Sequence, residues 1–462
     1  MRLPTGPTSA TQRAPLGLIR AKNMKRKDMA VPVALVKTGF FRLWAGETFS
    51  IAGSQITYFA MPLIAVLLLD AGSWEMGIVA AAGSAATLVF GLSAGVWADA
   101  MERRRVLQAA NLARALILAA VPVMWLLDAL SLWVLVTVTF LVGALSLLFD
   151  SAMSAYLPKV VGKKQLGPAN SWMEGSAAVG EVAGPGLAGV LVHAVGAPLA
   201  VLVDALSYFA SAIALRGLPR AAPEAPDGPR TPHFKAAVEG LRLLMRDRIQ
   251  RPLALAAAHF NFFTSMFYAL YTLYVVQELG FSPVVLGVLS AAGGLGGLLG
   301  STVASWISRR FGYGTPLALA YAVPGIAGLL VPLAEHQDRF TALVLVGLSQ
   351  FFWVLAVVVN LVMSETVKQT LVPDHMLGRV TGTVRFLSWG VEPFGALLAG
   401  ALGASLLGIR STLVLAAVGL STSAIWLLIG PIRGLRTLLD DEEPGGLPTT
   451  AATGDAALNE TT

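Results

Sequence analysis

Acidic residues inside long apolar segments are the features of this sequence that could do chemistry. Glu181 lies eleven residues into the apolar segment 170–193, about 16 Å deep at 1.5 Å per residue, and Glu174 precedes it by seven residues on the same helical face. Glu392 lies at a similar depth in the segment 382–406. A carboxyl group inside a bilayer costs several kcal/mol unless it is paired, protonated or hydrated.

Such a carboxyl group can carry a proton, because it loads and releases one as its surroundings alternate between wet and dry. We therefore predict proton coupling at Glu181 and Glu392. The alternative is a static role, in which each acid pairs with Arg114, Arg385 or a hydroxyl group. The candidates for proton coupling are Glu181, Glu392, Glu174 and Asp204.

Other acidic and aromatic residues are candidates for binding a substrate. Glu47 can attract a cation, but for this and the other shallow acids we favour a position in headgroup water. Aromatic residues recur at three- and four-residue steps in the segment 252–276 and form the run "QFFW" at 350–353. They can line a cavity for a greasy ligand or face lipid as interfacial belts. The cavity candidates are Glu47, Asp150, Phe263, Phe267, Tyr271, Phe352 and Trp353.

The elements that must position these residues are predicted by composition. Of 462 residues, 55% are hydrophobic and 13% charged, about half the charged fraction of a soluble domain. The chain has no cysteine, which excludes disulfides and thiolate metal sites. Twelve apolar segments are long enough to span a bilayer: 41–69, 75–98, 106–127, 131–155, 170–193, 197–217, 252–276, 283–307, 315–334, 340–364, 382–406 and 411–431. The sequence predicts an all-α membrane protein with twelve transmembrane helices.

Basic residues concentrate in alternate loops. If the N-terminus is inside, inside loops hold Arg103–Arg105, Lys159, Lys163, Lys164, the arginines from Arg220 to Arg251, Arg309, Arg310, Lys368, Arg379, Arg433 and Arg436. Outside loops hold only Arg339 and Arg410. The positive-inside rule therefore predicts that both termini are cytoplasmic. The net charge of +6 is then a topology signal, and we expect no nucleic-acid partner.

The chain divides into two similar halves. We predict a basic cytoplasmic tail (1–36), a six-helix bundle (37–218), a cytoplasmic linker with an amphipathic helix (219–250), a second bundle (251–435) and a disordered tail (436–462). Corresponding residues are offset by nearly constant numbers: Asp99 and Ser308 by 209, Leu166 and Leu377 by 211, Pro185 and Pro393 by 208. An internal duplication is predicted, which is the repeat pattern of one large transporter class.

Three groups of residues resemble the major facilitator superfamily, and the resemblance covers nearly all of 37–435. The run "GVWADAMERRR" (95–105) is similar to the family's loop between spans two and three, with Glu102 in place of the usual second glycine. "GEVAGPGLAG" (180–189) resembles its fifth-span antiporter motif. "FRLWAGETFSIAG", "NLARAL" and "LVPDHMLGRV" resemble the efflux branch that includes macrolide exporters and the enterobactin exporter.

The resemblance implies two pseudo-symmetric bundles of the major facilitator fold, with spans one, four, seven and ten lining the pathway and span five meeting span eight. It also implies proton-coupled export of an amphiphilic compound. The fourth span lacks the arginine of many drug–proton antiporters, so that coupling device is not expected here. Gly180, Gly184, Pro185 and Gly189 would form the interface motif, because glycines allow close helix approach.

The resemblance and the spacing of charges also point to a conformational latch on the cytoplasmic side. A carboxylate at Asp99 can accept hydrogen bonds from arginine or cap a helix N-terminus in one conformation only. Alternatively, the arginines only follow the positive-inside rule. The latch candidates are Gly95, Asp99, Arg103 and Arg104.

These features together predict a multi-pass protein of the cell's inner membrane. We expect a monomeric secondary transporter that exports a hydrophobic or amphiphilic small molecule by alternating access and proton antiport, in contact with membrane lipids. The alternatives are an importer or lysophospholipid flippase of the same fold, and a non-transporting membrane receptor. No phosphate loop, zinc-binding motif or nucleophile elbow is present, so we expect no enzyme activity, cofactor or metal.

Overall fold

The structure, a computed structural model, describes residues 39–91, 93, 97, 101–220, 241–242, 244–372, 374–429 and 432, with the backbone only for 374–380. Both predicted tails, Gly95, Asp99 and most of the linker with its amphipathic helix lie outside these residues.

Helices make up the described chain. The first half contains α2 (Phe40–Leu68), α3 (Ser73–Phe90), α5 (Arg103–Leu126), α6 (Leu132–Val161), η2 (Lys163–Gln165), α7 (Leu166–Val195), α8 (Ala197–Ala214) and η3 (Leu215–Gly217). The second contains α10 (Gln250–Leu273), η4 (Tyr274–Glu278), α11 (Pro283–Phe311), α12 (Gly314–Gly328), α13 (Leu330–Leu333), α14 (Arg339–Leu371), α15 (Asp374–Gly390), α16 (Glu392–Gly403), α17 (Gly408–Thr422) and α18 (Ile425–Ile429). Twelve segments in the described chain are long and apolar enough to cross a membrane, which confirms the predicted number.

The two ends of the helices differ in charge. At the end where α2 begins, the connections carry Arg103–Arg105, Lys159, Lys163 and Arg309; we call it the basic end. The other end carries the connections near 70, 129, 196, 280, 336 and 406, and we call it the opposite end. There Asp338 caps α14 by accepting hydrogen bonds from the amides of Phe340 and Thr341. The Thr341 side chain and these amides hold the pKa of the Asp338 carboxyl below its ordinary value.

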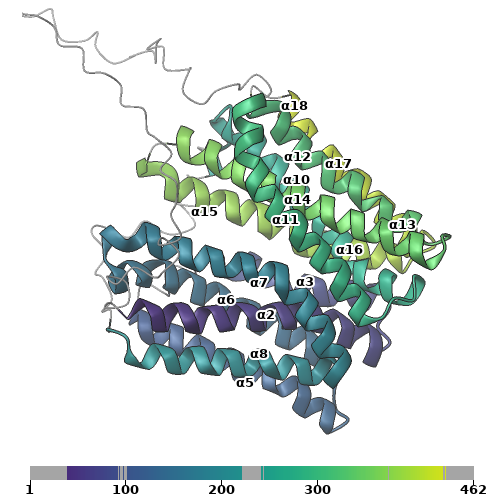
Figure 1. Ribbon diagram of the computed structural model, residues 1–462, viewed down its shortest axis with the longest axis horizontal. Helices are drawn as coiled ribbons and strands as arrows, with labels where there is room; N and C mark the ends of the chain where they lie inside the picture. Colours follow the sequence, from purple (N-terminus) through teal and green to yellow (C-terminus); the bar gives the residue numbers. More distant parts are fainter. Residues whose placement is uncertain are drawn as a thin grey trace, which may run out of the picture.

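The halves are joined mainly at two crossings, α7 with α11 and α3 with α16, and α10 and α15 make smaller contacts with α3. In Figure 1 the first bundle lies below the second, and the bundles meet at these helices and diverge toward the left, where α2 begins. Glycine permits the contact. A Cβ on Gly189 would lie 3.0 Å from the Cα of Gly287, and one on Gly77 would lie 2.8 Å from the Cα of Gly400. Side chains there would hold the helices apart.

The glycine crossings follow the internal duplication. Gly287 follows Gly77 by 210 positions, and Gly400 follows Gly189 by 211, close to the offsets of the sequence repeat. All four glycines lie within six residues of the helix end at the opposite end of the bundles. The halves are therefore packed most closely at the opposite end.

One transmembrane segment is interrupted near its middle. Helix α15 ends at Gly390 and α16 begins at Glu392, with Pro393 in its first turn. Proline has no N–H to donate, which weakens the hydrogen-bond ladder at this position. Non-helical backbone at membrane depth is tolerated where it faces protein or a cavity. The break places an acidic side chain at a helix N-terminus inside the membrane segment.

Candidate functional site

A cavity of about 460 Å³ lies between the two bundles at mid-depth, and we call it the central cavity. Most of its wall comes from the first half, with α10 and α16 closing it from the second. Its polar lining residues include Ser54, Thr57, Tyr58, Ser84, Thr87, Thr139, Ser146, Asp204, Tyr208, Thr264, Ser265, Tyr268 and Glu392. The volume is within the range of small-molecule sites, about 300–1,000 Å³.

Two of the predicted proton-coupling acids line this cavity from opposite halves. Asp204 on α8 is buried and accepts hydrogen bonds from the hydroxyls of Thr57 (2.5 Å) and Ser207 (3.1 Å). Glu392 begins α16, where the helix dipole favours negative charge. Within the described chain its carboxylate accepts no hydrogen bond; only its backbone carbonyl does, from Ser265 at 2.8 Å. In this cavity the Asp204 carboxylate is therefore hydrogen-bonded by two hydroxyls, and the Glu392 carboxylate is free to bind a ligand or a proton.

Unused hydroxyl groups add to the binding capacity of the cavity. The hydroxyls of Thr139 and Thr264 are buried and have no hydrogen-bond partner in the described residues. The rings of Tyr58 and Tyr268 are partly exposed. An uncompensated buried hydroxyl costs free energy, so a ligand with polar atoms would find partners that the protein itself does not occupy.

A polar network is buried in the first bundle beside this cavity. Ser211 donates to Glu47 (3.1 Å) and accepts from Asn111 (2.9 Å), whose carbonyl oxygen accepts from Arg114. Arg114 also donates to Ser146, a cavity residue, at 3.1 Å. The interpretation of Glu47 as a headgroup-water acid is wrong, because its side chain is only 7% exposed.

Arg114 is the cation that sequence reasoning undervalued. Its guanidinium stacks on Phe149 and Tyr208, 4.4 and 4.1 Å from the ring centroids. Tyr208 in turn shares a 2.8 Å hydrogen bond with Ser54. A charged residue inside an apolar segment is a functional candidate by default, and Arg114 is such a residue in the run "NLARAL". Its contacts with several partners could be recognised only in the folded structure.

Asp150 connects the first bundle with the second. Its carboxylate lies 4.0 Å from the guanidinium of Arg385 on α15, and it also interacts electrostatically with Arg114. Arg385 stacks on Trp389 at 4.2 Å. Asp150 is thus paired across the space between the bundles, and it does not line the central cavity.

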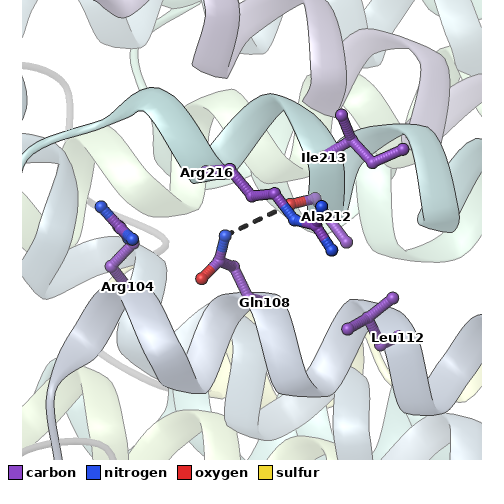
Figure 2. A pocket seen from close by; sticks show the side chains of 6 residues that line it. All are labelled: Arg104, Gln108, Leu112, Ala212, Ile213 and Arg216. Atoms are coloured by element: carbon purple, nitrogen blue, oxygen red, sulfur yellow. Dashed lines mark hydrogen bonds between the residues drawn. The ribbon is translucent and has the colours of Figure 1, made fainter.

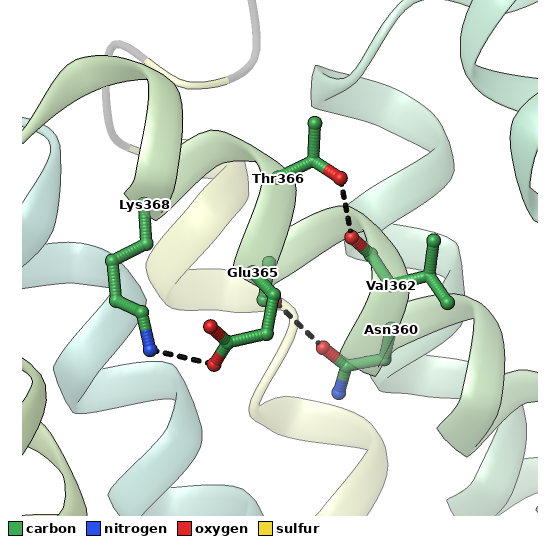
Figure 3. Close-up of polar contacts among 6 residues, drawn as sticks. Asn360, Val362, Glu365, Thr366 and Lys368 are labelled. Carbon is green, nitrogen blue, oxygen red and sulfur yellow. Dashed lines mark hydrogen bonds and ion pairs between the residues drawn. The ribbon is translucent and has the colours of Figure 1, made fainter. Parts of the chain in front are cut away.

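A second cavity of about 460 Å³ lies within the second bundle and opens near its basic end. Lys368 and Glu365 form a 2.5 Å ion pair on its wall, as Figure 3 shows. Ser364 donates a hydrogen bond to Asn360 at 2.9 Å. Arg385 and the buried, unpartnered hydroxyl of Ser388 also line it. The charge of Glu365 is therefore offset by Lys368 on the same helix, whereas the Glu392 carboxylate has no such cation in the described chain.

The other two proton-coupling candidates lie on α7, outside the central cavity. One face of α7 packs on α2 through Gly180 and Gly184, and another packs on α11 through Gly189. The prediction that Gly180 and Gly184 belong to the interface between the halves is therefore wrong, because they contact a helix of their own bundle. Two further faces of α7 lie between the face that contacts α2 and the face that contacts α11. With 3.6 residues per turn, Glu174 and Glu181 lie on one of these further faces. The second further face carries the exposed apolar side chains Val179, Leu187 and Val190. The acids lie on the side away from that apolar face.

The aromatic side chains lie elsewhere than we predicted. Phe267, Tyr271 and Trp353 are buried and pack on one another, with Phe267 and Trp353 centroids 4.8 Å apart. Phe263 contacts Gly419 of α17, and Phe352 is 44% exposed. None of these five lines either cavity, so the cavity prediction is wrong. Phe267, Tyr271 and Trp353 fill the core between α10 and α14, and Phe352 lies on an exposed face of α14. Tyr268, which we did not select, lines the cavity.

The structure describes part of the predicted latch and the proline of the predicted interface motif. Of the latch residues, Arg103 is buried at the start of α5, and Arg104 donates to the carbonyl of Leu218 at 2.6 Å. Pro185 lies inside a continuous α7, with its carbonyl 2.9 Å from a Cβ built on Gly287. His259 Nε2 lies within hydrogen-bond distance of the Gly419 carbonyl oxygen and the Thr422 hydroxyl.

Comparison with known proteins gives consistent matches. A family model described as Major Facilitator Superfamily matches residues 43–391. The multidrug efflux pump Tap of Mycolicibacterium fortuitum is 31% identical over 374 residues, which are 78% of this chain and 88% of Tap. The enterobactin exporter EntS of Salmonella choleraesuis is 26% identical over 421 residues, which are 89% of this chain and 98% of EntS.

Solved structures show the same fold. A bacterial homologue of the iron transporter ferroportin in an inward-facing state aligns with a TM-score of 0.67 at 16% identity, covering 85% of this chain and 98% of that one. A bacterial homologue of the lysosomal transporter Spinster, also inward-facing, aligns with a TM-score of 0.59 at 14% identity, covering 87% and 96%. Among the described residues, no group of three His, Asp or Glu gathers as metal ligands would.

Proposed function

This chain belongs to the major facilitator superfamily, and we propose that it exports a hydrophobic or amphiphilic small molecule in exchange for protons. As a member, it is a multi-pass inner-membrane transporter with a small-molecule substrate, and it is not an enzyme. The direction, the substrate class and the coupling ion are our proposal. The observation that carries it is the central cavity, which both bundles line and where Asp204 and Glu392 face the same space.

The proposed direction rests on relatives and on the arrangement of charges. Tap and EntS are named as an efflux pump and an exporter. Basic residues gather at one end, which the positive-inside rule would place in the cytoplasm, together with both termini. The glycine crossings close the opposite end, so a substrate would enter the central cavity from the cytoplasm in this conformation and leave after the bundles rock.

The proposed coupling uses two acids that compete with the substrate. The Glu392 carboxylate accepts no hydrogen bond from the described chain, and the Asp204 carboxylate accepts hydrogen bonds from two hydroxyls. A substrate or a proton can neutralise either acid, but both cannot occupy the same carboxylate. Arg114, reaching the cavity through Ser146, would offset the charge of the acids when no proton is bound. Exchange of substrate for protons follows from this competition.

The proposed substrate class follows from the cavity lining. Apolar residues such as Met61, Val79 and Val142 alternate with hydroxyls and two carboxylates. Such a wall suits a molecule with a large apolar body and a few polar or cationic groups. A small hydrophilic nutrient would leave much of this wall unused.

The deciding experiment uses everted membrane vesicles that contain the protein in a host lacking its own drug pumps. A pH gradient is monitored by a fluorescent dye while a panel of amphiphilic compounds is added. We expect particular compounds to release protons from the vesicles, with the same compounds tolerated at higher concentration by growing cells. Compound uptake without proton movement would overturn the coupling, and accumulation in intact cells would favour import.

A further inference from the structure

A groove of about 280 Å³ on the outside of the first bundle is separate from the central cavity. It lies between α5 and α8 at the basic end and is lined by Arg104, Gln108, Leu112, Ala212, Ile213 and Arg216. Gln108 donates to the Ala212 carbonyl at 3.4 Å and so ties the two helices beneath it, as the dashed line in Figure 2 shows. The groove is therefore a fixed feature of this helix pair.

Positive charge at the groove is not cancelled within the described chain. Arg104 uses one nitrogen to donate to the Leu218 carbonyl at 2.6 Å, and its Nε is buried without a hydrogen-bond partner. Arg216 is exposed and makes no ion pair with a described residue. The nearby carboxylate of Glu102 is engaged by Arg105 at 2.9 Å. Two guanidinium groups thus remain available to an anion.

The groove changes from cationic to apolar along the helices. Leu112 lies two turns beyond Arg104 on α5, and Leu116, 74% exposed, lies one turn farther. On α8, Ile213 and then Phe209 lie progressively farther than Arg216 from the basic end, and each is 47% exposed. The charged part is therefore at the basic end, and the apolar part extends toward the middle of the membrane.

We propose that this groove binds an anionic phospholipid, with its phosphate between Arg104 and Arg216 and an acyl chain along the apolar part. Arginine offers a planar fork that matches phosphate oxygens, and basic pockets between transmembrane helices bind acidic lipid headgroups. A free phosphate ion would satisfy the arginines but would leave the apolar part of the groove uncovered. This lipid site is independent of the transport substrate.

The test measures lipid occupancy next to the groove. Because the chain has no cysteine, Leu206→Cys gives a single labelling site on the lipid-exposed face of α8, one turn beyond Phe209. The labelled full-length protein is placed in lipid nanodiscs with brominated phosphatidylglycerol or brominated phosphatidylcholine of the same acyl chains. We expect phosphatidylglycerol to quench the label at lower mole fraction. Arg216→Gln should weaken this preference about fivefold, the effect of one basic side chain at a membrane surface.

Arg309→Gln is the matched control, because Arg309 is exposed at the basic end of the second bundle. It removes the same charge and should leave the preference unchanged. Equal quenching by both lipids, or equal loss in Arg216→Gln and Arg309→Gln, would overturn the proposal. Displacement of the lipid by millimolar inorganic phosphate would identify a free-phosphate site instead. If Arg216→Gln does not fold, the two lipids are compared on the labelled Leu206→Cys parent at low and high salt. A preference for phosphatidylglycerol that weakens with salt would support the proposal, and no preference would overturn it.

Discussion

Asp150 and Arg385 lie at equal depth in opposite halves of the protein. Asp150 is eleven residues from the basic end of α6, and Arg385 is eleven residues from the basic end of α15. Their charged groups are 4.0 Å apart. Since the partners belong to different bundles, their distance depends on how the bundles are oriented, and we predict that the pair stabilises the conformation described here.

Removing this pair should shift the balance of conformations. Both side chains are about half exposed, so the pair contributes at most about 1 kcal/mol and Asp150→Asn should change the ratio of conformers by up to about fivefold. The readout is maleimide labelling of Ser73→Cys, which is buried beside Gly403 at the opposite end. We expect faster labelling in Asp150→Asn. Arg385→Lys should behave like the parent, and identical rates in all three would remove the pair from the conformational balance.

The cavity acids should be needed for proton movement. Asp204→Asn and Glu392→Gln are each expected to abolish compound-driven proton release in everted vesicles while the protein remains in the membrane. Glu278→Gln is the control, because Glu278 is exposed at the opposite end of its helix. Full proton release by either cavity variant would show that the acid carries no coupling proton.

Glu181 remains a prediction to be tested in the same assay. It shares a face of α7 with Glu174, away from the exposed apolar side chains, but it does not line the central cavity. We expect Glu181→Gln to reduce the rate of proton release, because the acid would relay protons between the cavity and the basic end. Undiminished proton flux would eliminate Glu181 as a carrier.

The glycine crossing should tolerate no side chain. Gly189→Val would place its Cβ 2.8 Å from the carbonyl oxygen of Pro283, and such overpacking typically costs about 1–3 kcal/mol. We expect a lower midpoint of thermal unfolding in detergent and loss of transport. Gly175→Val on the same helix is the control, because a Cβ there meets nothing within 4 Å. Equal behaviour of the two variants would mean that the crossing is not tightly packed in the membrane.

Tyr268 should contribute to substrate binding. Its ring lines the central cavity, and an aromatic contact is worth about 1 kcal/mol beyond area burial, so Tyr268→Ala should raise the apparent KM for export about fivefold or more. Tyr271→Phe is the control, because the Tyr271 hydroxyl is buried without a partner and its removal should be neutral or stabilising. A change confined to the maximal rate of Tyr268→Ala would argue against a direct contact.

The location of the elements was predictable from the sequence because a membrane helix must be one long apolar run. The twelve segments, the acids within them and the near-constant offset between the halves are all local properties of the chain. The close approach of α7 to its neighbours was likewise predictable, since only small residues permit close crossings. Which neighbour each glycine meets was not predictable, because Gly180 and Gly184 face α2 and only Gly189 faces α11. The structure confirmed the segments and added the pairing of Gly189 with Gly287 and of Gly77 with Gly400.

The tertiary structure alone decided which faces of the helices meet. Lipid tails and protein cores are both apolar, so the composition of a span does not show which way a side chain points. That is why Phe267 and Trp353 were wrongly placed in a cavity, and why Glu47 was expected in headgroup water although Ser211 and its network bury it. Asp204 and Glu392 are 188 positions apart in the sequence. Only the packing of α8 and α16 around one space makes them parts of the same site.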